Sequence, residues 1–221
     1  MTLSTGDYVS PPSDRRYFAG GMEQFHHPRP VRTGRSHGCV PTPQRRELVA
    51  GLSGRILEIG AGDGVKLSCF PANVTEIVLV EPDPFLRAAA GRVAAGVTVP
   101  VEILEGDPRR LPVGDGSCDA VVCSLVLCCA TSVRETLREV RRVLAPGGEL
   151  RFYEHQRSSN PVVSLAESLL APLWSRVAGG CDPARDTVAA IRRAGFEIEA
   201  LDRFVFRHFA HALGTARPGQ A

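Results

Sequence analysis

From residue 43 onward, apolar positions follow two alternating patterns along the chain. Short apolar runs bounded by glycine, proline and polar residues indicate β-strands, and segments with apolar residues three or four positions apart indicate helices. Strands are predicted at residues 55–59, 76–80, 99–104, 119–127, 149–153 and 196–206, with a short last strand within 208–215. Helices are predicted at residues 44–52, 84–95, 133–144, 162–177 and 184–194.

This order of strands and helices predicts the fold class. Strands separated by helices form a mostly parallel sheet that is covered on both faces. The continuous apolar run at 119–127 is typical of a central strand in such a sheet. We therefore expect an α/β fold with a single Rossmann-like, doubly wound domain over residues 43–221. Its seven-stranded sheet should be mostly parallel with an antiparallel C-terminal strand.

Residues 1–42 differ from the rest of the chain. The pairs Pro11-Pro12 and Gly20-Gly21 and the His-His-Pro-Arg-Pro segment at 26–30 interrupt every periodic pattern. We expect an irregular N-terminal arm over residues 1–42.

The composition narrows the class of function. A formal net charge of +2 over 221 residues differs from the concentrated basic face of nucleic-acid-binding proteins, so we expect no nucleic-acid partner. The sequence has no apolar stretch of about 18 residues, which a membrane span requires, so we expect no membrane anchor. The seven cysteines include no CxxC motif with a second ligand pair, so we expect no metal site. Reduced thiols indicate the cytoplasm.

The glycine-rich segment after the first strand is the main candidate for chemistry. Residues 58–64 read Glu-Ile-Gly-Ala-Gly-Asp-Gly and are expected to open a helix. Glycines let the backbone adopt positive φ and approach a ligand closely. A dinucleotide site favours GxGxxG, with the pyrophosphate at a helix N-terminus, whereas this loop is one residue shorter and carries Glu58 and Asp63. Acidic groups repel a pyrophosphate but suit a cationic sulfonium with an amino group, so the charge pattern favours S-adenosylmethionine over NAD.

Two further acidic positions follow the next two strands. Glu81 ends the second strand, about 20 residues after the loop, where a carboxylate accepts hydrogen bonds from both hydroxyls of a ribose. NAD enzymes use the same position, so Glu81 indicates an adenosine ribose without choosing the cofactor. Asp107 lies just past the third strand, where its carboxylate can meet the adenine amino group.

Together these segments resemble the class I S-adenosylmethionine-dependent methyltransferases, from about residue 45 to the C-terminus. The broad resemblance is to the branch that contains the quinone C-methyltransferases. A narrower one is to the animal thiol S-methyltransferases and their bacterial relatives, although the N-terminal hydrophobic anchor of the animal proteins is not carried over. The broad resemblance rests on residues 57–64, 81–83, 105–108, 111–112, 115–119 and 143–148. The narrower one rests on residues 122–128, 152–155, 179–182 and 185–187.

The resemblance implies S-adenosylmethionine as cofactor and gives particular residues a role. The glycine-rich loop would surround its methionyl part, with Glu58 at the amino group. Glu81 would hold the ribose, Asp107 and Pro108 would hold the adenine, and the end of the fourth strand would close the methionine side. The implied cofactor-binding residues are Glu58, Gly60, Ala61, Gly62, Gly64, Glu81, Pro82, Asp107, Pro108, Ser124 and Leu125.

The acceptor is less well defined by the sequence than the cofactor. Methyl transfer from a sulfonium is an in-line displacement, for which the protein supplies alignment and a dry pocket. A thiol with a pKa near 8.5 is partly thiolate at neutral pH, whereas a phenol or alcohol needs a base. His155 is the candidate catalytic base because it follows the fifth strand, although a histidine that only binds a loop carbonyl fits the sequence equally well.

The leading expectation is therefore an enzyme that methylates a small-molecule acceptor, a thiol foremost. An O-, N- or C-methyltransferase of secondary metabolism or of a quinone-like ring remains open. From a different class, a cofactor-binding protein without turnover also remains open.

Overall fold

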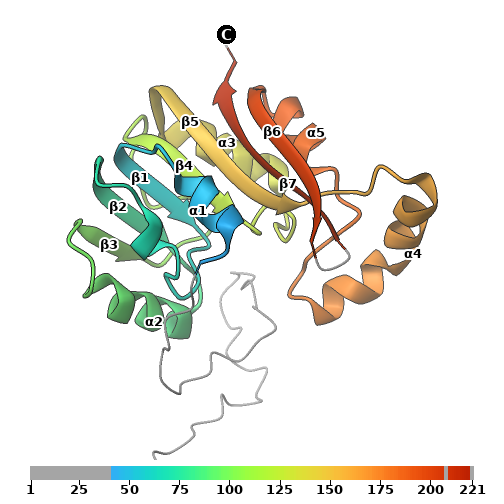
Figure 1. Cartoon of the computed structure of the whole chain (residues 1–221), viewed down its shortest axis with the longest axis horizontal. Coiled ribbons are helices and arrows are strands. Elements are labelled where there is room, and N and C mark those ends of the chain that lie inside the picture. The colour runs from blue at the N-terminus through green and yellow to red at the C-terminus, as the bar shows by residue number, and fades with distance from the viewer. Residues whose placement is uncertain (1–40, 207–208, 220–221) are drawn as a thin grey trace, which may run out of the picture.

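The computed structural model describes residues 41–206 and 209–219 (Figure 1), so nearly all of the N-terminal arm expected at 1–42 lies outside the described residues. Seven strands form one sheet in the order β3-β2-β1-β4-β5-β7-β6. Pairs from β3 to β5 are parallel, and β7 is antiparallel to both β5 and β6. The predicted fold class is confirmed. The strands are β1 (Gly54–Ile59), β2 (Val74–Val80), β3 (Val101–Leu104), β4 (Cys118–Ser124), β5 (Leu144–His155), β6 (Phe196–Phe206) and β7 (Phe209–Pro218).

Each α-helix begins after a polar side chain that accepts a hydrogen bond from the first turn, which satisfies N–H groups that have no partner within the helix. These N-cap residues are Thr42, Asp83, Ser132, Asn160 and Asp186. The helices that follow them are α1 (Pro43–Val49), α2 (Pro84–Ala94), α3 (Val133–Val143), α4 (Pro161–Val177) and α5 (Thr187–Arg193).

The sheet separates two hydrophobic cores, one on each face. Helices α1 and α2 contribute to one core, which includes Leu48 and Ala90. Helices α3 and α5 contribute to the other, which includes Leu137 and Ile191. Alternate residues of the central strands point to opposite cores, so β1 and β4 are buried on both faces, as the apolar runs of the sequence predicted.

Helix α4 is different, because it projects away from the sheet (Figure 1). Several of its apolar side chains are exposed, among them Leu165, Leu169 and Leu173. None of the helices in the described ranges is long and apolar enough to cross a membrane.

Two sequence predictions were wrong at the carboxyl edge of the sheet. The fourth strand ends at Ser124, whereas the apolar run suggested residue 127, because the chain turns at Leu125, which has a φ of 59°. The α-helix expected after the glycine-rich loop is absent, and the short 3-10 helix η2 (Leu67–Cys69) takes its place. Pro71 ends the segment, because its ring and missing N–H cannot continue a helix.

The fifth strand is longer than predicted. The Pro-Gly-Gly segment at 146–148 was expected to separate helix α3 from this strand, yet β5 begins already at Leu144. Gly148 explains part of this, since a Cβ there would lie 3.0 Å from the Ala145 carbonyl oxygen and 3.1 Å from that of Asp119. The glycine therefore allows β5 to approach β4 closely.

Candidate active site

The parallel topology gathers the predicted site residues at one edge of the sheet. The glycine-rich loop follows β1, Glu81 follows β2 and Asp107 lies beyond β3. Ser124 is the last residue of β4 and His155 the last of β5. Because these five strands are parallel, their carboxyl ends lie at the same edge, which is where ligands of doubly wound sheets bind.

The glycine-rich loop combines tight packing with one open position. Gly60, Gly62 and Gly64 have φ values of 64°, 61° and 76°. A Cβ at Gly60 would lie 2.6 Å from Val126 Cγ2, and one at Gly64 would lie 3.1 Å from Ala90 Cα, so packing excludes side chains at both. A Cβ at Gly62 would meet no atom within 4 Å. The loop is therefore open to a ligand at Gly62.

Glu81 connects the end of β2 to this loop. Its side chain is buried, and its Oε2 accepts a hydrogen bond from the Gly62 N–H at 2.8 Å. Its Oε1 accepts one from the Asp83 N–H at 3.0 Å. Burial raises the pKa of Glu81, and the two N–H donors act against this shift. Arg87 donates to the carbonyl oxygens of Glu81 and Pro82 and so fixes the backbone beside the carboxylate.

Glu58 lies in a buried ion pair that the sequence analysis did not predict. Its Oε1 lies 2.6 Å from Lys66 Nζ, and the two side chains are only 1% and 4% exposed. Burial raises the pKa of Glu58, against the opposing effect of Lys66. The lysine therefore balances the charge that we expected to face the cofactor's amino group, and that role of Glu58 stays a prediction. Ala61 is buried in the core.

Asp107 has an arginine partner that could not be foreseen from spacing. Arg109 Nε lies 3.1 Å from Oδ1 and Nη2 lies 2.7 Å from Oδ2, and the Arg109 N–H also donates to Oδ1 at 2.8 Å. Burial alone would raise the pKa of Asp107, but the bonds from Arg109 outweigh it and lower the pKa. Pro108 is buried between these two residues.

A buried carboxylate holds the turn after β4, and the sequence analysis missed its role. Glu154 Oε1 accepts hydrogen bonds from the N–H groups of Val126 and Leu127, and Oε2 accepts one from Cys128, each at 3.0 Å. The pKa of Glu154 is raised because burial outweighs the opposing effect of these three donors. Leu125 N–H donates to the Tyr153 carbonyl oxygen at 2.7 Å. Glu154 thus fixes the turn that follows Ser124 and Leu125.

His155 lies among aromatic rings at the end of β5. Its ring centroid lies 4.6 Å from that of His211 and 5.5 Å from that of Phe209, and Trp174 lies 5.0 Å from Phe209. Burial lowers the pKa of His211, and the neighbouring His155 lowers it further. This wall of the site is therefore aromatic and largely apolar.

The other side of His155 faces thiols. Its Nδ1 lies 3.1 Å from Cys181 Sγ and 3.5 Å from Cys128 Sγ. Hydrogen bonds from Cys128 and Cys129 lower the pKa of the Cys181 thiol, and His155 adds to this against the effect of burial.

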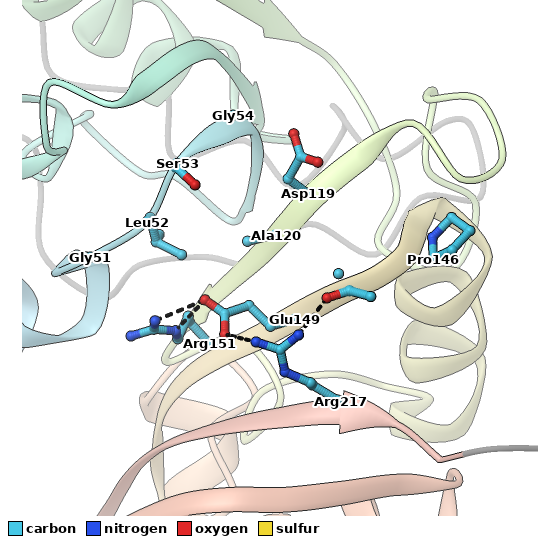
Figure 2. Close-up of a pocket in the computed structure, with 12 residues that line it drawn as sticks. Gly51, Leu52, Ser53, Gly54, Asp119, Ala120, Pro146, Glu149, Arg151 and Arg217 are labelled. Carbon is cyan, nitrogen blue, oxygen red and sulfur yellow. Dashed lines mark hydrogen bonds and ion pairs between the residues drawn. The ribbon is translucent and has the colours of Figure 1, made fainter.

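A pocket of about 480 Å³ lies at the opposite edge of the sheet, near the amino ends of β1 and β4 (Figure 2). Glu149 lies between Arg151 and Arg217 there, with N–O distances of 2.8 and 3.4 Å. None of the predicted site residues lines this pocket. It is polar and belongs to a different part of the molecule from the carboxyl-edge site.

Comparison with known sequences identifies the family. A model of a methyltransferase domain matches residues 57–152. Thiol S-methyltransferase TMT1B of Homo sapiens is 34% identical over 175 residues, which is 72% of this chain and 70% of the relative. Thiol S-methyltransferase TMT1A of Homo sapiens is 33% identical over 66% of this chain and 62% of its own length. Ubiquinone/menaquinone biosynthesis C-methyltransferase UbiE of Pseudomonas putida (strain GB-1) is 29% identical over 57% of this chain and 51% of its own.

Solved structures share the fold. The YcgJ protein of Bacillus subtilis superposes with a TM-score of 0.63 at 18% identity, covering 76% of this chain and 93% of its own. The methyltransferase CalH in complex with SAH gives a TM-score of 0.57 at 24% identity, over 76% of this chain and 52% of CalH. With the sequence matches, they show that the chain belongs to the class I S-adenosylmethionine-dependent methyltransferases and uses S-adenosylmethionine as its cofactor.

Proposed function

We propose that this methyltransferase transfers the methyl group of S-adenosylmethionine to a small thiol. The observation that carries the proposal is the similarity to human thiol S-methyltransferases, which extends over 72% of the chain. The aligned 175 residues extend beyond the methyltransferase-domain match at residues 57–152. Because acceptor pockets in this fold are formed by residues outside the shared domain core, this longer similarity bears on the acceptor.

The cofactor-binding part of the proposal rests on the glycine-rich loop and Glu81. The open position at Gly62 lies directly beside the buried Glu81 carboxylate. Each carboxylate oxygen has about two acceptor positions, so Glu81 retains capacity for ribose hydroxyls after its two backbone bonds. We assign Gly60, Gly62 and their loop to the methionyl part and Glu81 to the ribose.

The remaining cofactor contacts come from the ends of β3 and β4. Asp107 and Pro108 would flank the adenine, and the bonds from Arg109 hold the Asp107 side chain in place. Ser124 and Leu125 would close the methionine side, where Glu154 fixes the following turn. These assignments share one physical basis, namely that all the groups lie at the carboxyl edge of the sheet.

The chemistry asked of the protein is modest. The sulfonium of the cofactor supplies an electrophilic methyl group, and the chain supplies alignment and exclusion of water. A thiol needs no positioned base, because it is already partly thiolate near neutral pH. The aromatic wall formed by His155, Phe209 and Trp174 supports an apolar acceptor.

A phenol, alcohol or amine acceptor is the second candidate, and His155 is the residue that favours it. Because His155 Nδ1 faces the sulfurs of Cys128 and Cys181, the other ring nitrogen would have to accept the acceptor's proton. In that case His155→Ala should lower turnover of a phenol by about 10²–10⁴, the usual contribution of a general base.

The test is a panel of small thiols, phenols and amines incubated with the full chain and methyl-labelled S-adenosylmethionine. We expect label in the thioether product of an alkyl thiol. Label only in a phenol ether or a methylated amine would contradict the thiol proposal and leave the family assignment intact. A cytoplasmic location is part of the same proposal, and the six free cysteines of the described ranges support it.

A further inference from the structure

Four side chains with soft donor atoms meet where three separate segments come together beside β5. Cys128 and Cys129 lie in the turn after β4, His155 ends β5, and Cys181 lies between α4 and α5. The three Sγ atoms all lie within 4.8 Å of one another, whereas His155 Nδ1 lies close to the sulfurs of Cys128 and Cys181 but more than 4.8 Å from that of Cys129. Cys128 Sγ lies 3.7 Å from Cys129 Sγ and 3.5 Å from His155 Nδ1, and Cys181 Sγ lies 3.1 Å from the same nitrogen.

We propose that these three cysteines and His155 form a zinc site of the Cys₃His type. A tetrahedral Zn²⁺ with bonds of about 2.3 Å to sulfur and about 2.0–2.1 Å to nitrogen keeps two sulfurs about 3.8 Å apart and a sulfur about 3.5 Å from the nitrogen. The separation of Cys128 from Cys129 and that of Cys128 from His155 match these values. The separation of Cys181 from His155 needs to lengthen by only about 0.4 Å to match the same geometry.

The turn that carries Cys128 and Cys129 is held in place by groups outside the cluster. Glu154 accepts a hydrogen bond from the Cys128 N–H at 3.0 Å. Arg185 Nη1 donates to the carbonyl oxygens of Leu127 and Ala130, each at 2.7 Å. An acidic and a basic side chain thus hold the backbone of the turn that carries Cys128 and Cys129.

The other two ligands are tied to the same framework. The Asp182 N–H donates to the Cys128 carbonyl oxygen at 3.0 Å, which fixes Cys181 next to the turn. Thr187 Oγ1 donates to the His155 carbonyl oxygen at 3.1 Å. Gly180 has a φ of 83°, and a Cβ at this position would lie 3.3 Å from the Cys129 carbonyl oxygen. The glycine therefore lets the two segments approach closely. The fold therefore pre-positions the three sulfurs and places His155 Nδ1 beside two of them, so only the separation of this nitrogen from Cys129 has to shorten when an ion binds.

The donor set selects the class of ion. Thiolate sulfur and imidazole nitrogen are preferred ligands of zinc and other soft or borderline metals, whereas magnesium and calcium take oxygen. Four protein ligands leave no open coordination position, which is typical of a structural site. The ion would therefore fix the turn after β4, the end of β5 and the α4–α5 connection against one another. This proposal replaces the expectation from the sequence that no metal site is present. It also excludes His155 as a general base in the zinc-bound protein, because an imidazole bound to zinc through Nδ1 carries its proton on Nε2.

The test is zinc and cobalt binding by the purified full chain under reducing conditions. We expect one Zn²⁺ per chain by elemental analysis, and Co²⁺ substitution should give thiolate charge-transfer bands. Removing a residue that hydrogen-bonds to a metal ligand typically lowers the metal affinity by about 10–100-fold. Cys181→Ser and Cys129→Ser remove a ligand itself, so each should lower the affinity for Zn²⁺ by at least that factor. Cys69→Ser is the matched control, because Cys69 is a free thiol outside the cluster.

Equal zinc affinity in wild type and Cys129→Ser would overturn the proposal. The proposal would also be overturned if the wild-type chain bound no Co²⁺ after any Cys128–Cys129 disulfide had been reduced. If Cys181→Ser does not fold, the site can still be tested in the wild-type chain by measuring the alkylation of each cysteine with and without zinc. Zinc should then protect Cys129 and Cys181 from iodoacetamide while leaving Cys69 reactive, and equal labelling with and without zinc would count against the site.

Discussion

At the scale of single residues, Glu81 is the side chain on which the cofactor assignment depends most. It is 3% exposed, and each oxygen of its carboxylate already accepts one backbone hydrogen bond. Those bonds orient the carboxylate before any ligand arrives, so little further ordering is needed when a ribose binds. Preorganisation of this kind raises affinity because its entropic cost is met during folding.

Replacing Glu81 by alanine should weaken S-adenosylmethionine by roughly 1.5–3 kcal/mol, the range for hydrogen bonds to a charged group. Calorimetric titration should show a similar loss for the demethylated product, since both ligands carry the same ribose. Glu76→Ala is the control, because Glu76 lies in β2, the strand that precedes Glu81, but pairs with Arg55. A loss confined to the methyl donor would argue against the ribose role.

Gly62→Ala tests whether the open position in the loop belongs to the cofactor. Gly51 offers a matched control, since it also has a positive φ of 74° and no atom within 4 Å of an added Cβ, but it precedes β1 at the other edge. Both variants should lose about 1–2 kcal/mol of stability, the cost of a left-handed conformation for an alanine. Only Gly62→Ala should weaken S-adenosylmethionine, by at least about tenfold (~1.4 kcal/mol). Equal affinity in the two variants would remove the loop from the binding site.

At the scale of elements, the turn after β4 explains where the sequence predicted correctly and where it did not. The turn contains three buried residues, Val126, Leu127 and Cys128. A run of apolar residues predicts a strand even where the backbone N–H groups of the run do not pair with another strand. Here those groups pair with Glu154, 26–28 residues later in the chain. No local pattern contains that information, so the strand's existence could be predicted and its end could not.

Glu154→Gln should destabilise the protein although it keeps size and shape. A glutamine offers one acceptor oxygen and one donor group, so at least one of the three N–H groups loses its partner and faces another donor. The expected cost is about 1–3 kcal/mol, as for a buried group left unsatisfied. Urea unfolding measures it, with the partly exposed Glu199→Gln as control. Unchanged stability would mean that water or a rearranged turn satisfies these groups.

At the scale of the whole molecule, parallel topology makes the cofactor side predictable. Once strands alternate with helices, residues that follow successive strands must meet at one edge, and Gly62 and Glu81 do so at 2.8 Å. The thiol cluster lacks this regularity. Cys128, His155 and Cys181 come from a turn, a strand end and an inter-helix connection, and their meeting depends on how the chain returns from α4, which the sequence pattern does not specify.

The identity of the acceptor gives the last prediction, because it concerns what the assembled molecule does. If the acceptor is a thiol that reacts as its thiolate, the rate at low acceptor concentration should rise with pH and follow the acceptor's own pKa, near 8.5 for an ordinary thiol. Two alkyl thiols of different acidity, compared on wild-type enzyme with saturating S-adenosylmethionine, should then give pH–rate curves whose midpoints differ by the difference in their pKa values. A midpoint that stays the same for both thiols would show instead that a group on the protein controls deprotonation. In the zinc-free chain, His155 would then be the first residue to replace.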